Sequence, residues 1–123
     1  MIGYKAGESL STGMFNVCIG TNAGEDITTS MFNVCIGIGS GTNLTTGLAT
    51  VGSNIYIGHR TYASASDVDN EVVLAGGTAV LSTVGNGRNT AVIGSAACSD
   101  VYASKDAGAD VHCKDLEYSG ALN

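Results

Sequence analysis

The stretch MFNVCIG fills Met14 to Gly20 and returns letter for letter from Met31 to Gly37, 17 residues later. Seven identical residues in a row within a chain of 123 residues indicate an internal repeat. Aligning the chain on the isoleucine of this block extends the repeat well beyond the duplication, at spacings of 17 to 21 residues. The aligned positions are Ile2, Ile19, Ile36, Ile57, Leu74 and Ile93.

Small residues recur at two fixed places after the aligned position. Glycine follows in five repeats, and Ala75 follows in the remaining one. The residue four places after the aligned position is always small: Ala6, Ala23, Ser40, Thr61, Thr78 and Ala97. The glycine predicts a turn with positive φ, or a place where the backbone passes close to another chain.

The residues around each aligned position alternate as the two faces of a strand. One face is wholly aliphatic, and we predict that it forms the core ladder: Val17, Ile19, Val34, Ile36, Ile55, Ile57, Val72, Leu74 and Ile93. The other face is also mostly apolar: Cys18, Cys35, Tyr56, Val73 and Val92. Strands that are apolar on both faces are usually buried on both. Because one coil per repeat encloses one interior, the second face needs cover, for which further copies of the chain are the simplest source.

The polar, glycine-rich segments between these strands, such as ESLSTG and EDITTS, predict turns and a short second strand. The expected fold is all-β: a stacked β-roll, or a triple β-helix or β-prism, with about 17 to 21 residues per rung in a parallel homotrimer. The repeat domain spans residues 1–98. Residues 99–123 lack the repeat and are expected to form a C-terminal β segment.

The composition narrows the function classes. A net charge of −6 argues against nucleic acid and against an anionic membrane surface, both of which need basic patches. There is no apolar run long enough to span a membrane, and the first residues lack the pattern of a signal peptide. The start within a motif and the uncapped end suggest part of a longer fibrous protein. We expect no cofactor.

The cysteines at 18, 35, 98 and 113 contain no C-x-x-C pair, so neither a zinc site nor a thioredoxin-like site is predicted. Cys18 and Cys35 occupy equivalent places, where small apolar core or interface residues are the main interpretation and a disulfide framework is the lesser one. Side chains stacked in parallel on successive rungs have poor geometry for a disulfide.

Candidate binding residues cluster in GHRTY, Gly58 to Tyr62, where His59, Arg60 and Tyr62 could contact a glycan or receptor, although a solvated turn is the ordinary interpretation. The segment DVDNE, Asp67 to Glu71, has three carboxylates that could hold a cation, but it lacks the spacing of a calcium loop, and we predict no metal site. The GNG at 85–87 lacks the context of a phosphate loop.

The elements NVCIGTNAG, NVCIGIGSG, SNIYIGHRTY and NTAVIGSAAC resemble the head repeats of bacterial trimeric autotransporter adhesins. They are even more similar to repeats of phage tail fibres and of attachment proteins of large DNA viruses. The chain departs from the pattern at Cys18 and Cys35, where alanine is usual, and in the rung NEVVLAGGTAV, which lacks the glycine.

The resemblance implies a parallel homotrimer that serves as a rigid stalk or a receptor-binding head on a virion surface or extracellular fibre. The expected function is therefore a structural and receptor-attachment segment of a viral or phage fibre, which binds a host cell-wall glycan or surface receptor and is not an enzyme. The alternatives are a bacterial adhesin head or a left-handed β-helix acyltransferase, whose hexapeptide period the chain does not follow. Loops for binding are expected near Thr42 to Ser53 and Ser82 to Asn89.

Overall fold

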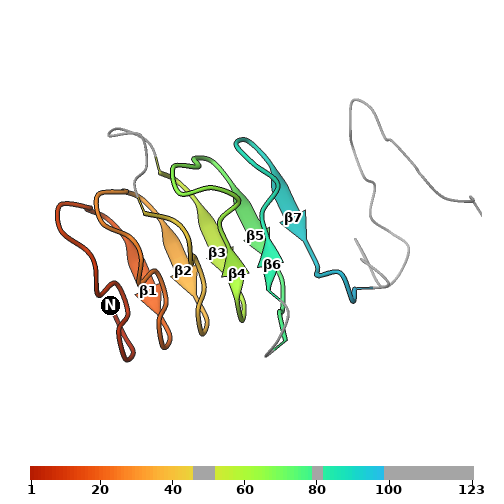
Figure 1. Cartoon of the computed structure of the whole chain (residues 1–123), viewed down its shortest axis with the longest axis horizontal. Coiled ribbons are helices and arrows are strands. Elements are labelled where there is room, and N and C mark those ends of the chain that lie inside the picture. Colours follow the sequence, from red (N-terminus) through yellow and green to blue (C-terminus); the bar gives the residue numbers. More distant parts are fainter. Residues whose placement is uncertain (46–51, 79–81, 99–123) are drawn as a thin grey trace, which may run out of the picture.

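The computed structural model describes residues 1–45, 52–78 and 82–98. In this part the chain forms a parallel β-solenoid of about four turns, with rungs about 19 residues apart (Figure 1). No helix in the described part is long and apolar enough to cross a membrane. The predicted segment 99–123 lies outside the described residues.

Five short strands, one from each successive coil, stack in chain order into one parallel sheet (Figure 1). They are β1 (Val17–Ile19), β2 (Val34–Ile36), β3 (Ile55–Ile57), β5 (Val72–Leu74) and β7 (Ala91–Ile93). The register pairs Ile19 with Ile36, Ile36 with Ile57, Ile57 with Leu74 and Leu74 with Ile93. An isolated bridge adds Ile2 opposite Ile19. The alignment from sequence is therefore confirmed at every step.

The glycine that follows every strand of this sheet except β5 turns the chain and allows the coils to stack. Gly20 has φ +127°, a conformation that side-chain-bearing residues rarely adopt. A Cβ atom at Gly20 would lie 2.6 Å from the carbonyl oxygen of Gly37, its counterpart in the next coil. The predicted positive φ is confirmed, and the close approach is to the next coil of the same chain.

The opposite side of the coil is less regular. A second parallel sheet pairs β4 (Thr61–Tyr62) with β6 (Thr83–Val84), and an isolated bridge joins Thr42 to Tyr62. In the earlier coils backbone hydrogen bonds replace strands, as where Gly7 donates to Ala23 and Gly24 donates to Ser40. The predicted second strand is thus present only in the later coils of the described part.

The solenoid interior is lined by the strand face that holds Cys18, Cys35, Tyr56 and Val73, all fully buried. Facing them are the small residues four places after the aligned position, of which Ala23, Ser40 and Thr61 are also fully buried. The apolar side chains of Ile27, Leu44, Ala63 and Val68 also belong to this core. The recurrence of small residues therefore reflects the narrow space inside the coil.

The predicted core ladder does not form the interior of the chain, which corrects the assignment made from sequence. Its exposed fractions are 43% for Val17, 37% for Ile19 and 60% for Ile93. The whole set is exposed or half-buried on the outside of the sheet: Val17, Ile19, Val34, Ile36, Ile55, Ile57, Val72, Leu74 and Ile93. The physical reason is that both strand faces are apolar, so hydrophobicity did not determine which face the coil encloses.

Cys18 and Cys35 are register partners with free, fully buried thiols, as the main interpretation predicts. They lie next to glycines: a Cβ atom at Gly24 would lie 2.7 Å from Sγ of Cys18. A hydrogen bond to Cys18, together with burial, raises the pKa of the Cys35 thiol. The two thiols are therefore part of the packed interior.

Candidate functional site

The turn after β3 carries the three predicted binding residues. His59 and Arg60 follow Gly58, and Tyr62 lies in β4. All three side chains are half-buried. Arg60 adopts φ +55°, which turns the chain sharply from one sheet towards the other.

Arg60 and Tyr62 come together at this turn. The guanidinium carbon of Arg60 lies 5.7 Å from the centre of the Tyr62 ring, within the range of a cation–π contact. A cation held against an aromatic ring presents both charge and an apolar surface, which suits sugars and anionic groups.

Neighbouring coils fix the backbone of this turn on both sides. Arg60 N–H donates to the carbonyl of Ile38 at 2.9 Å, and the carbonyl of Arg60 accepts from Thr83 N–H at 3.0 Å. The carbonyl of His59 accepts from Gly77 N–H at 2.7 Å. Backbone hydrogen bonds to the neighbouring coils therefore hold the Arg60–Tyr62 turn in place.

The three carboxylates of the segment 67–71 have separate environments. Asp67 is exposed, Asp69 pairs with Arg88 at 2.9 Å, and Glu71 is fully buried. Within the described ranges no group of three or more His, Cys, Asp or Glu side chains is placed to hold a metal ion.

Glu71 forms a buried polar network that the sequence did not predict. One carboxylate oxygen accepts from the Tyr56 hydroxyl at 2.8 Å and from Ser64 N–H at 3.1 Å. The other accepts from Gly87 N–H at 2.7 Å. Burial, followed by the hydrogen bond to Glu71, raises the pKa of Tyr56. The GNG segment at 85–87 thus donates a backbone hydrogen bond to a buried carboxylate.

The position of Glu71 continues an internal asparagine ladder. Oδ1 of Asn16 accepts hydrogen bonds from the backbone N–H and the side-chain Nδ2 of Asn33. Oδ1 of Asn33 accepts the same two bonds from Asn54. Oδ1 of Asn54 then accepts from the backbone N–H of Glu71. Aligning the residue before each strand of the five-stranded sheet would have revealed this column, with Glu71 and Thr90 as its exceptions.

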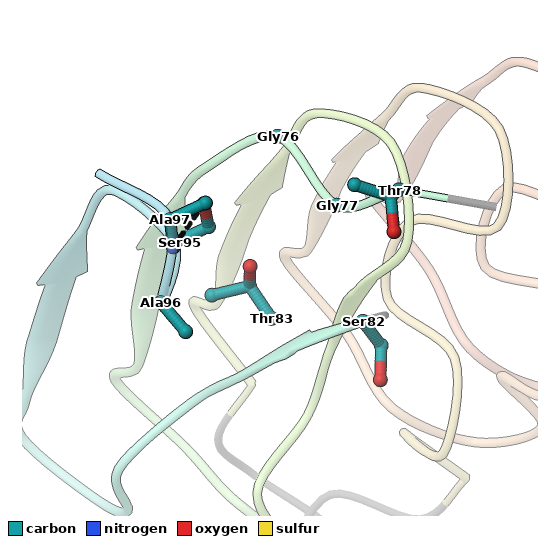
Figure 2. A pocket seen from close by; sticks show the side chains of 8 residues that line it. All are labelled: Gly76, Gly77, Thr78, Ser82, Thr83, Ser95, Ala96 and Ala97. Carbon is teal, nitrogen blue, oxygen red and sulfur yellow. Dashed lines mark hydrogen bonds between the residues drawn. The ribbon is translucent and has the colours of Figure 1, made fainter. Parts of the chain in front are cut away.

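A small hollow of about 70 Å³ lies beside the later coils (Figure 2). It is lined by Gly76, Gly77, Thr78, Ser82, Thr83, Ser95, Ala96 and Ala97. Small-molecule sites typically measure about 300–1,000 Å³, and none of these side chains is an acid, a base or an activated nucleophile. The hollow therefore offers no candidate for catalysis.

Of the two predicted loop regions, the first is only partly described, because residues 46–51 lie outside the described residues. The second, Ser82 to Asn89, is described throughout. Within the second, Asn70 Nδ2 donates to Asn89 Oδ1 at 2.8 Å and Thr90 Oγ1 donates to Gly87 at 2.6 Å. The first bond ties the segment to the coil before it, and the second closes a local turn.

Comparisons of the chain with protein-family models, with curated proteins and with solved structures found no match.

Proposed function

We propose that the chain is a structural and receptor-attachment segment of a viral or phage fibre, which acts as a parallel homotrimer and binds a host cell-surface glycan or receptor. The observation that carries this proposal is the exposed aliphatic side of the five-stranded sheet. We call this side the outer face: Val17, Ile19, Val34, Ile36, Ile55, Ile57, Val72, Leu74, Ala91 and Ile93.

The outer face has the chemistry of a contact between copies of the chain. Parallel sheets are normally covered on both faces, and contiguous exposed apolar patches mark interaction sites. No charged residue belongs to the outer face, although the chain carries a net charge of −6. Association through this side buries aliphatic surface without burying a charged side chain of the outer face.

Parallel copies suit this face because its two columns repeat from coil to coil. Val17, Val34, Ile55, Val72 and Ala91 form one column, and Ile19, Ile36, Ile57, Leu74 and Ile93 form the other. Copies that run in the same direction match each coil with its equivalent. The number three rests on the resemblance to trimeric fibres, and the location on a fibre rests on it too.

Light scattering on the purified chain tests the assembly. The wild type is expected to have the mass of three chains, and Ile19→Glu/Ile57→Glu is expected to have the mass of one, because it places carboxylates in the buried contact. Thr21→Glu, an exposed position outside the outer face, is the control and should remain trimeric. A folded wild-type monomer at micromolar concentration would sink the proposal.

The attachment role is assigned to His59, Arg60 and Tyr62. Arginine and tyrosine are common at binding hot spots, and this turn is held rigidly by its neighbours. A host cell-wall fraction that retains the wild-type trimer is expected to retain Arg60→Ala/Tyr62→Ala at least tenfold less, a change of about 1.4 kcal/mol.

The control for this binding assay is Lys5→Ala/Tyr4→Ala. Lys5 also lies over a tyrosine ring, at 5.9 Å, but on a different coil and with an exposed ring. Equal retention of the Arg60/Tyr62 variant and the wild type would remove this turn as the attachment site. Failure of the wild type to bind any host fraction would contradict the attachment role, and only the structural role of a spacer would remain.

A further inference from the structure

Two phenylalanines stack on the outside of the first coils, immediately before the asparagines that lead into β1 and β2. The ring centres of Phe15 and Phe32 are 5.0 Å apart and their planes differ by 10°. Their exposed fractions are 69% and 47%. We call these two residues the aromatic pair.

The backbone makes phenylalanine an unexpected residue at this position. Phe15 and Phe32 both have φ +59°, a left-handed conformation that is unfavourable for a bulky side chain. The equivalent residues of later coils are Ser53, Asn70 and Asn89, with φ between +56° and +61°. Among the amino acids, glycine adopts this conformation most readily, and asparagine is one of the few others that tolerate it. The two phenylalanines therefore occupy a position at which their own backbone geometry does not favour them.

The outer face has a second property that bears on the aromatic pair. Because its columns hold similar aliphatic residues in every coil, two copies could slide by one coil and still match aliphatic side chains. Repetitive surfaces of this kind specify their register weakly. A residue type that breaks the repeat is what distinguishes one register from another.

We propose that the aromatic pair sets the axial register between parallel copies of the chain; this inference rests on the proposed self-association through the outer face. The partner of the aromatic pair is the aromatic pair of a second copy. The pair directly precedes Asn16 and Asn33, which lead into the outer-face strands, and it is uncharged. It is also confined to the β1 and β2 coils, so a slip by one coil would bring phenylalanine opposite Ser53.

The register can be read by photo-crosslinking between copies. The photoreactive residue p-benzoylphenylalanine replaces Ile55, which lies on the outer face in the middle coil. This chain is co-assembled with an unmodified chain of heavier isotopes, and only links between light and heavy chains are counted. Links within one chain, to the adjacent Val34 or Val72, are thereby excluded.

In the otherwise wild-type chain, links from position 55 are expected to fall on the β3 coil of the other copy. In Phe15→Asn/Phe32→Asn the mass of the assembly should be unchanged, but links should also fall on the β2 and β5 coils. Asparagine already occupies this position at Asn70 and Asn89, so the variant is expected to fold, which circular dichroism checks. Tyr4→Asn, which removes an exposed aromatic ring from another turn, is the control and should keep the single register.

The outcomes distinguish the register role of the aromatic pair from the proposed self-association through the outer face. A wild type that does not assemble contradicts the proposed function and removes the basis of the register role. An assembled variant that keeps one register overturns the register role alone. A variant that becomes monomeric while Tyr4→Asn assembles also overturns it, because the aromatic pair would then drive association.

Discussion

In the coils of β1 and β2, Asn33 lies over Asn16 and Cys35 lies over Cys18, so these two interior columns repeat the same side chain. Tyr56 takes the cysteine position in β3, and Glu71 takes the asparagine position before β5. The asparagine column of the early coils satisfies its amide groups by repetition, with each amide bonded to the next. The later coils need a specific set of unlike partners, which come from three separate segments of the chain.

This difference indicates which coils of the solenoid tolerate substitution of their interior polar residues. A ladder of like residues distributes its hydrogen bonds, so each member contributes a similar amount. The Glu71 network concentrates three donors on one carboxylate. Buried polar networks stabilise when they are fully satisfied and become costly when one member is lost. The later coils are thus expected to be the more sensitive part of the described chain.

The largest effect is expected for Glu71→Ala. It leaves the Tyr56 hydroxyl and two backbone N–H groups without their acceptor in the interior, at a cost of about 3–5 kcal/mol in the free energy of unfolding. Urea denaturation followed by circular dichroism measures it. Glu8→Ala, which removes an exposed carboxylate paired with Lys5, is the control and should change stability little. Similar losses in both variants would contradict the role of the network.

The next effect is expected for Gly20→Ala in the early coils. A side chain at φ +127° is strained, and its Cβ atom would press on the carbonyl of Gly37. The expected loss of unfolding free energy is about 2–4 kcal/mol. The matched change is Ala75→Gly, at the one equivalent position without glycine, which should cost at most about 1 kcal/mol. Equal effects of the two substitutions would show that this turn does not limit stacking.

Alkaline pH is expected to weaken the later coils through Tyr56. Its pKa in the folded chain is raised above the ordinary value of 10.0, so the folded chain keeps a proton that the unfolded chain loses. Stability should therefore be intact below pH 10 and fall above it, by about 1.4 kcal/mol for each pH unit. The Tyr56→Phe variant should be less stable than the wild type at neutral pH. Its free energy of unfolding should lack the part of the decline at alkaline pH that comes from ionisation of Tyr56.

The Cys35 thiol, whose pKa is also raised, acts in the same direction from its ordinary value of 9.0. The tyrosine measurement is therefore made in the Cys18→Ala/Cys35→Ala background. An alkaline decline that is the same with tyrosine and with phenylalanine at position 56 in that background would count against the explanation.

The smallest effect is expected for Cys18→Ala/Cys35→Ala itself. Alanine fits the same narrow interior, and the lost sulfur atoms leave small cavities at a cost of about 1 kcal/mol each. Thiol counting checks their state: this variant should have two fewer reactive thiols than the wild type when denatured, and the same number when native. A wild type with no additional thiol on denaturation would contradict free, buried Cys18 and Cys35.

Much of the fold was predictable because stacking leaves a direct trace in the sequence. Each coil places the same positions in the same environment, so Ile19, Ile36 and Ile57 recur at the spacing of the register pairs. The candidate turn was recognisable from its residue types, although the contact of Arg60 with Tyr62 was not. The Glu71 network was missed because its partners, Ser64 and Gly87, carry no signal in the sequence and meet it only when coils stack.

The sequence by itself determined the period, the register and which side chains share a strand face, since alternation and repetition are local properties of the chain. Only the tertiary structure decided which face became the interior. Both faces are apolar, so the hydrophobic effect favours burial of either one. The chain turns at the glycines towards the strand face that holds Cys18, Cys35, Tyr56 and Val73. These side chains share the narrow interior with the small residues Ala23, Ser40 and Thr61. That closure left the larger aliphatic columns on the outside of the coil, because one coil can enclose only one face of its strands.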